Sequence, residues 1–371
     1  MESLESKKVK GFLPSAGIWV TVLFILMLIG LHLTHYDPFN ALGGEMGPER
    51  PISTIGARGI WFWNNVVPPI TLCVVGYFVY KSVKTKTVTW WLLFAIGAAS
   101  MFPFESFCDW GGMLTWSPEF PNYGSQTIIS FPWHVNELPT YTIWAYAAYW
   151  GFHAFLLAKG IHYLMEKKGW SKLKAILVLA VPTGYILNLC VEGFSTYMGW
   201  WQYEPIIGPY IDWSHVSPDH VGTYPLFDPV VIAIIWPTTI AILTDSVGES
   251  KYELHKIDKF FHLETLLPVT HPSHPDYTGD PEASPEKFAW KFEITRVFIW
   301  IGIFVWTYCL CMWGPLMIIR YIAGIDSVYA PLPTLAEGKS PAAGFVFLAC
   351  TLILAIALYF IEKKRAVKAL S

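Results

Sequence analysis

The chain has 371 residues, of which 54% are hydrophobic and 14% are charged, and its formal net charge is −3. Ordinary soluble domains carry about 25% charged residues, so this composition argues against a soluble globular protein. The small negative charge gives no indication of a nucleic-acid partner.

Eight long apolar runs divide the chain. Each is close to the roughly 20 residues that a helix needs to cross a bilayer core, and runs this continuous are helical because a helix satisfies its own backbone inside lipid. We therefore expect an all-α fold, a multi-pass transmembrane helical bundle that forms a single membrane domain over residues 1–371. The runs cover residues 17–34, 60–80, 88–105, 142–165, 173–194, 229–245, 296–319 and 342–361.

Lysine and arginine are concentrated on one set of the connecting loops. They occur before the first run, at 81–86, 167–174 and 251–296, and after the last run. The alternate loops hold only Arg50, Arg58 and Lys339, with Arg320 at an edge. The positive-inside rule then places the N- and C-termini and the loop 246–293 in the cytoplasm, and we expect the plasma membrane of a bacterium.

Aromatic residues make up 17% of the chain, and many lie near the ends of the runs. This position is typical of aromatic belts at the membrane interface. Examples are Trp61, Trp63, Trp90, Trp91, Trp200 and Trp201.

Carboxylates at the outer ends of the runs are the candidate catalytic groups, because an ionisable side chain at membrane depth is costly and is a functional-site candidate. Glu105 and Asp109 are four residues apart, so a continuing helix would place both on one face. Asn188 and Glu192 have the same spacing in the fifth run. The alternatives are a solvated helix end for the first pair and a structural hydrogen bond between helices for the second.

Two further segments lie on the same side. Asp228 precedes Pro229 at the start of the sixth run, a pattern that is also typical of a helix N-cap, and Tyr224 lies just before it. Trp200 and Tyr203 follow the fifth run and would line the mouth of a pocket or belong to a belt. We expect Glu105, Asp109, Glu192 and Asp228 to converge in one cavity that opens outward.

Histidine pairs lie on opposite sides of the predicted membrane and form no box of clustered ligands, so we predict neither a metal site nor a cofactor. Nucleotide-binding, haem-attachment and serine-hydrolase motifs are not found in the sequence.

Several short stretches resemble the AveC-like family, named after a spirocyclase of avermectin biosynthesis. They are Val191-Glu192-Gly193-Phe194, Met198-Gly199-Trp200-Trp201-Gln202-Tyr203, Gly222-Thr223-Tyr224-Pro225, Ile234-Ile235-Trp236 and Thr244-Asp245-Ser246-Val247-Gly248, within residues 60–250. Glu105-Ser106 departs from the Gln-Asp that is typical of the family at that point, which leaves the role of Glu105 open.

The resemblance implies a membrane-embedded cyclase of secondary metabolism that forms a spiroketal, in some members with a dehydration. Its substrate would be an apolar polyketide- or lipid-like small molecule, with membrane lipid as the other partner. By this hypothesis Glu192, Glu105, Asp109 and Asp228 are catalytic, and Asn188, Trp200, Tyr203 and Tyr224 bind substrate. The alternative is a non-enzymatic transporter or sensor for a lipophilic small molecule, although the chain lacks the internal repeat that is common in transporters.

Overall fold

The computed structural model describes residues 54–102, 105, 114–122, 138–203, 210–216, 222–226, 228–244, 254–280 and 283–308. Most of these residues are helical, which agrees with the all-α expectation. The first and last predicted spans, 17–34 and 342–361, and the carboxylate Asp109 lie outside the described residues.

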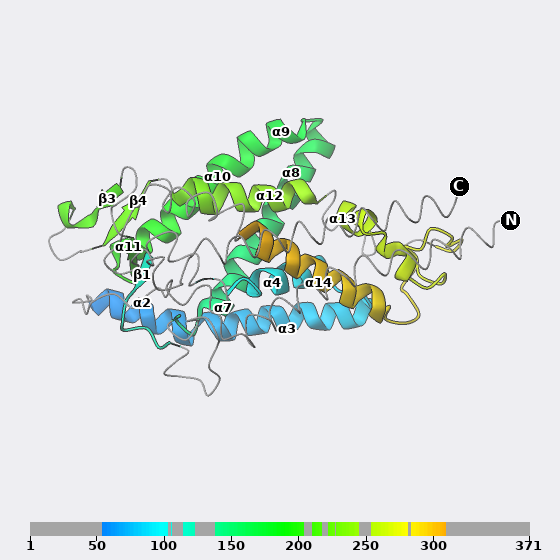
Figure 1. Ribbon diagram of the computed structural model, residues 1–371, viewed down its shortest axis with the longest axis horizontal. Coiled ribbons are helices and arrows are strands. Elements are labelled where there is room, and N and C mark those ends of the chain that lie inside the picture. The colour runs from blue at the N-terminus through cyan, green and yellow to red at the C-terminus, as the bar shows by residue number, and fades with distance from the viewer. Residues whose placement is uncertain are drawn as a thin grey trace, which may run out of the picture.

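Two of the described helical stretches are long and apolar enough to cross a membrane, Gly56–Thr85 and Lys172–Tyr197. The first comprises α2 (Thr54–Asn65) and α3 (Val67–Thr85), which lie along one edge of the molecule (Figure 1). Large apolar side chains on both stretches are exposed, for example Val83 at 67% and Ile186 at 60%. Exposed apolar surface of this extent marks a face that contacts another apolar phase.

The eight-span expectation is not supported in full. Among the described residues, α4 (Trp90–Ala99) and the stretch Ile232–Leu243 are apolar but shorter than a bilayer core requires. The stretch of α7 (Thr142–Ala145), η3 (Tyr146–Trp150) and α8 (Gly151–Lys168) is long enough but carries many Tyr, Trp and His residues. Helix α14 (Trp290–Trp306) has 17 residues.

Helix α4 occupies the centre of the helical core. Its N-cap is Thr89, whose hydroxyl accepts a hydrogen bond from the Leu92 N–H, and its side chains are apolar around the whole circumference. A helix of this kind must be covered on all sides. It packs against α8, η3 and α14, and the ring of Phe94 lies 5.3 Å from Trp300 and 5.4 Å from Phe304.

This packing corrects part of the aromatic-belt expectation. Trp61 is 61% exposed and suits a belt, but Trp90, Trp200 and Trp201 are buried core residues. Position near the end of an apolar run therefore does not distinguish a belt residue from a core residue, because both lie where helices meet the loops.

Within the described ranges, four short segments have π-helical hydrogen bonding, in which the backbone N–H bonds five residues back. They are η3 (Tyr146–Trp150), η4 (Ile176–Ala180), η5 (Leu189–Gly193) and η7 (Pro229–Ile235). Two of them directly precede a proline-containing turn, since Pro182 lies in α10 (Val181–Asn188) and Pro237 in α12 (Trp236–Leu243). Proline has no N–H and crowds the preceding turn, which explains the wider turns at η4 and η7.

The remaining elements of the fifth and sixth runs are short. Helix α9 (Lys172–Ala175) begins at Ser171, whose hydroxyl accepts a hydrogen bond from the Lys174 N–H, and α11 (Phe194–Tyr197) ends the fifth run. The preceding turn passes through Gly169, whose φ of +62° is the left-handed conformation that glycine adopts without strain.

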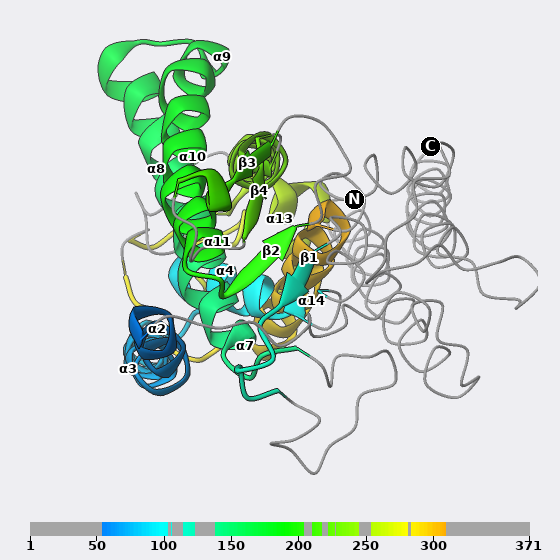
Figure 2. The same cartoon turned by 90° about the vertical axis from the view of Figure 1, so that its left-hand side faces the viewer.

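Two small antiparallel sheets lie together at one end of the molecule (Figures 1 and 2). Strand β1 (Leu114–Trp116) pairs with β2 (Trp201–Tyr203), and β3 (Tyr210–Asp212) pairs with β4 (Thr223–Pro225). A 3₁₀ turn, η6 (Trp213–His215), follows β3. The segments that form these strands are the outer loops of the predicted topology.

The opposite end holds the described part of the loop 246–293, with α13 (Lys256–Phe260) and η8 (Leu263–Leu266) (Figure 1). It is tied to the helices by a buried ion pair, in which Arg296 of α14 lies 3.2 Å from Asp258. The guanidinium also lies 3.7 Å from the ring centre of Trp90, on which His255 stacks. This loop is therefore docked against the helices through polar contacts, and Leu263 and Leu267 also pack with Phe292 and Ile299 of α14.

Candidate active site

Strands β1 and β2 form one wall of a cavity. Their register pairs Leu114 with Tyr203 and Trp116 with Trp201. Alternate residues of a strand point to the same face, so these four side chains share a face of the sheet, and all four line the cavity. The two-stranded sheet thus presents three aromatic rings to the cavity.

The stretch α7–η3 forms a second wall. Tyr141, Thr142, Ala145, Tyr146 and Tyr149 all line the cavity, a spacing of three or four residues that places them on one helical face. The Tyr149 hydroxyl is buried and has no hydrogen-bond partner within the described part of the chain. It is therefore an available polar group in the wall.

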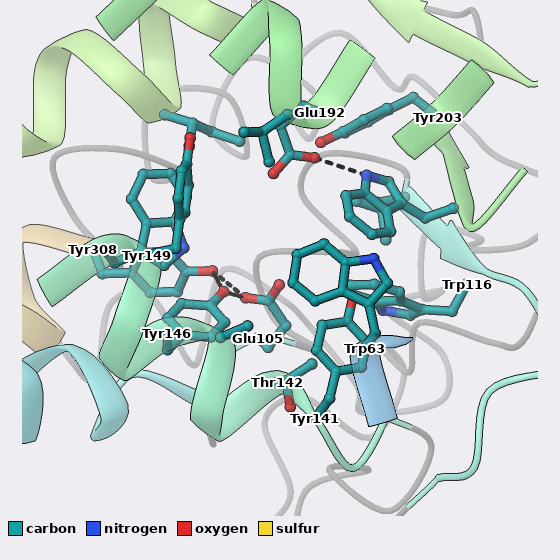
Figure 3. A pocket seen from close by; sticks show the side chains of 16 residues that line it. Trp63, Glu105, Trp116, Tyr141, Thr142, Tyr146, Tyr149, Glu192, Tyr203 and Tyr308 are labelled. Atoms are coloured by element: carbon teal, nitrogen blue, oxygen red, sulfur yellow. Dashed lines mark hydrogen bonds between the residues drawn. The ribbon is translucent and has the colours of Figure 1, made fainter. Parts of the chain in front are cut away.

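Glu192 enters the cavity from η5. Its Oε2 accepts a hydrogen bond of 2.7 Å from the Trp201 indole N–H, and its other carboxyl oxygen faces the hollow (Figure 3). Asn188, expected from its i,i+4 spacing to share a face with Glu192, ends α10 just before η5 and does not line the cavity. Asn188 is fully buried beside Tyr224, whose hydroxyl donates to Oδ1 of Asn188 at 2.6 Å.

Glu105 lies on the opposite side of the hollow (Figure 3) and is only 8% exposed. The hydroxyls of Tyr146 and Tyr308 both donate to its Oε2, and the two hydroxyl oxygens are 2.6 Å apart. Oε2 of Glu105 and the two tyrosine hydroxyl oxygens form a triangle. The triangle holds two protons when Glu105 is ionised and three when Glu105 is protonated.

The cavity between the two carboxyl groups is lined by 16 residues, most of them aromatic or aliphatic (Figure 3). It contains about 650 Å³ of space that protein atoms do not fill, including space open to solvent. Small-molecule sites are typically apolar hollows with a few convergent polar groups. The cavity has the composition of such a site.

Asp228 is fully buried, and its charge and that of Glu192 act on each other. Its side chain does not cap η7, and neither carboxyl oxygen has a hydrogen bond at ordinary distance within the described residues, although Asn188 and Tyr203 lie beside it. Asp228 therefore occupies the N-cap position before Pro229, as the helix-start alternative predicts, but its side chain makes no capping hydrogen bond. Glu192 also acts on Glu105, so the three carboxyl groups form one electrostatic cluster. Like charges this close in an apolar site do not all ionise at once.

The predicted site residues therefore fall into three groups. Glu105, Glu192 and Tyr203 line the cavity, whereas Asn188, Tyr224 and Asp228 are buried outside its lining. Trp200 contacts α2 instead: its indole N–H donates to the Gly56 carbonyl at 2.9 Å.

Sequence reasoning missed the tyrosines and tryptophans that complete the cavity, above all Tyr146, Tyr308 and Trp201. Tyr146 and Tyr308 lie in different apolar runs and more than 160 residues apart, so no local pattern connects them with Glu105. Trp201 could have been found from the sequence, since it alternates with Tyr203 along one short segment, as residues on one face of a strand do.

Within the described residues, no three His, Cys, Asp or Glu side chains are grouped so that they could hold a metal ion. Comparisons of the chain with protein-family models, curated proteins and solved structures find no match. The assignment of a function therefore depends on the chemistry of the cavity itself.

Proposed function

We propose that this protein is a membrane-embedded acid–base catalyst that acts on an apolar small molecule, with Glu192 and Glu105 as its catalytic residues. The observation that carries the proposal is that these two carboxyl groups face one hollow from opposite sides, each with its own hydrogen-bond donors. Two carboxyl groups in one apolar site can act as an acid and a base on the same substrate.

The reaction class that suits this pair best is the cyclase chemistry of the AveC-like family. A hydroxyl of the substrate adds to a ketone to give a hemiketal. Glu192 then donates a proton to the hemiketal hydroxyl, which leaves as water, and an oxocarbenium ion remains. A second hydroxyl attacks this cation and passes its proton to the triangle of Glu105, Tyr146 and Tyr308. The net change is a dihydroxyketone to a spiroketal and one water, and the proton returns to Glu192 through the cavity.

Several features favour this assignment of roles. The second oxygen of Glu192 faces the hollow, where it can reach a substrate directly (Figure 3). Glu105 shares its oxygen with two hydroxyls, which suits a group that stores a proton and releases it later. Electrostatic stabilisation by fixed groups of this kind is a large part of many catalytic effects.

The test is a substitution of Glu192 by glutamine, which keeps the shape of the side chain but cannot transfer a proton. Comparing the metabolites of a deletion strain with those of its parent identifies the substrate and the product. The strain is then complemented with wild type, Glu192→Gln or the control Glu166→Gln, whose side chain is exposed on α8. We expect Glu192→Gln to lower the rate about 10²–10⁴-fold at an unchanged protein level in the membrane. Full conversion by this variant would refute the catalytic role of Glu192.

The alternative is a transporter or sensor, and the same experiment separates it from a catalyst. A transporter or sensor leaves the metabolite unchanged and alters only its location or the response to it. A new covalent product that depends on the protein is therefore the result that distinguishes the two.

We further propose that the protein crosses the membrane several times, with the residues near Lys86 and Lys172 in the cytoplasm, in the plasma membrane of a bacterium. The exposed apolar faces of Gly56–Thr85 and Lys172–Tyr197 and the placement of lysines support this topology. Reporter fusions after Lys86 and Lys172 should read cytoplasmic, and one near Gly124 should read external. An external reading of the fusion after Lys172 would contradict this topology.

A further inference from the structure

The lining of the cavity has an unusual balance of charge. Two carboxyl groups, Glu105 and Glu192, face the hollow, and Asp228 lies behind the same wall. None of the 16 lining residues that the structure describes is a lysine, arginine or histidine. A positively charged ligand in this cavity therefore meets carboxyl groups, whose ionised form it favours, without a compensating cation among the described lining residues.

Aromatic side chains supply most of the remaining wall. Four tryptophans line it, and Figure 3 shows Trp63 and Tyr149 on opposite sides of the space between the two carboxyl groups. The lining tryptophans are Trp63, Trp116, Trp150 and Trp201. The face of an aromatic ring carries partial negative charge and attracts cations, and tryptophan is the strongest of these rings. Aromatic faces combined with carboxylates are the groups that bind organic ammonium ions.

The sequence of the predicted outer loops also favours a positively charged ligand. The segments 106–141 and 195–228 contain no lysine or arginine, whereas they hold seven aspartates and glutamates. Both segments contribute strands to the wall of the cavity, β1 from the first and β2 from the second. Clustered charge of one sign around a site raises the local concentration of ligands of the opposite sign.

We infer that the cavity is a site for an organic cation, and that its ligands are amphiphilic molecules in which an apolar body carries a centre of positive charge. The inference deepens the proposed function and rests on it, because the proposed reaction passes through an oxocarbenium ion. It goes further in naming a class of stable ligands, the tertiary and quaternary ammonium ions, which resemble that cation in charge. Such molecules should occupy the cavity whether or not it turns over a substrate.

The experiment compares two molecules of the same shape. Benzyltrimethylammonium is a cation, and neopentylbenzene has a carbon atom in place of the nitrogen and is neutral. Their binding to the full chain in nanodiscs of zwitterionic lipid is measured by isothermal titration calorimetry, with empty nanodiscs as the blank. Wild type should bind the ammonium ion at least about tenfold more tightly, as expected for a desolvated cation against several rings and carboxylates.

Variants then test whether the preference for the ammonium ion arises in the cavity. In the double variant Glu105→Gln, Glu192→Gln the preference should fall to about threefold or less, while binding of neopentylbenzene stays as in wild type. Glu166→Gln should bind both molecules as wild type does. Where the double variant does not fold, Trp116→Leu replaces it and should also weaken binding of the ammonium ion more than that of neopentylbenzene.

Three results would overturn the inference: equal binding of the two molecules by wild type, no binding of either, or a preference that survives in the variants. Its failure can be told apart from that of the proposed function. If the preference is missing while Glu192→Gln still abolishes conversion, the protein is a catalyst without a cation site. If the preference is present while Glu192→Gln converts normally, the cavity binds cations but Glu192 does not catalyse.

Discussion

The contact between α10 and η7 has no room for a side chain at Gly184. A Cβ atom at this position would lie 2.3 Å from the backbone oxygen of Ala233, whereas ordinary contacts begin near 3.4 Å. The Gly184→Ala substitution therefore requires the two segments to separate by about 1.1 Å, from 2.3 to 3.4 Å. The obstacle is backbone, so no rotation of a side chain can relieve it.

Overpacking of a well-packed core typically costs about 1–3 kcal/mol. Alanine also favours the helix over glycine by about 1 kcal/mol, which acts in the opposite direction. A matched control removes this second effect. Gly76 lies on the exposed face of α3, and a Cβ there has no neighbour within 4 Å. We therefore expect Gly184→Ala to be less stable than Gly76→Ala by about 1–3 kcal/mol, because the gain in helix propensity is common to both.

The measurement is the midpoint of thermal unfolding of the purified chain in one detergent, with SDS titration as a second denaturant. Gly76→Ala should unfold at or above the wild-type temperature, and Gly184→Ala below it. Catalysis should also fall in Gly184→Ala, because α10 continues directly into η5, which carries Glu192. Equal stability of the two variants would refute the close approach of α10 and η7.

The docked part of the loop 246–293 leads to the remaining predictions. Arg296→Met leaves the carboxyl group of Asp258 buried without its partner and should cost about 3–5 kcal/mol, most of which the double variant with Asp258→Asn should recover. The exposed Arg58→Met is the control, and a double variant no more stable than Arg296→Met would contradict the ion pair. Burial lowers the pKa of His271 from about 6.5 to about 4, with a smaller contribution from Arg296. Between these two values the unfolded loop binds more protons than the docked loop, so docking should weaken as the pH falls from 6.5 to 4. Limited proteolysis of the loop should accelerate over this range in wild type and less in His271→Gln, and a rate independent of pH would refute the argument.

Several properties of this protein follow from its sequence alone. The long apolar runs determine its helical character, because a continuous apolar segment can satisfy its backbone only as a helix. The rarity of carboxylates in such runs identified Glu105 and Glu192 as candidates before any contact was known. Both line the cavity, although Asn188 and Tyr224 lie outside it.

Only the tertiary structure decided how these residues meet. Glu192 lines the cavity from η5, whereas Asn188 is buried beside Tyr224, and the i,i+4 spacing alone does not reveal this difference. Trp201 reaches the cavity through the pairing of two strands about 85 residues apart in the chain. Tyr146 and Tyr308 meet Glu105 from separate helical segments. Sequence patterns report periodicity along one element, whereas a site of this kind forms between elements, and their relative positions are set by the packing of the whole core.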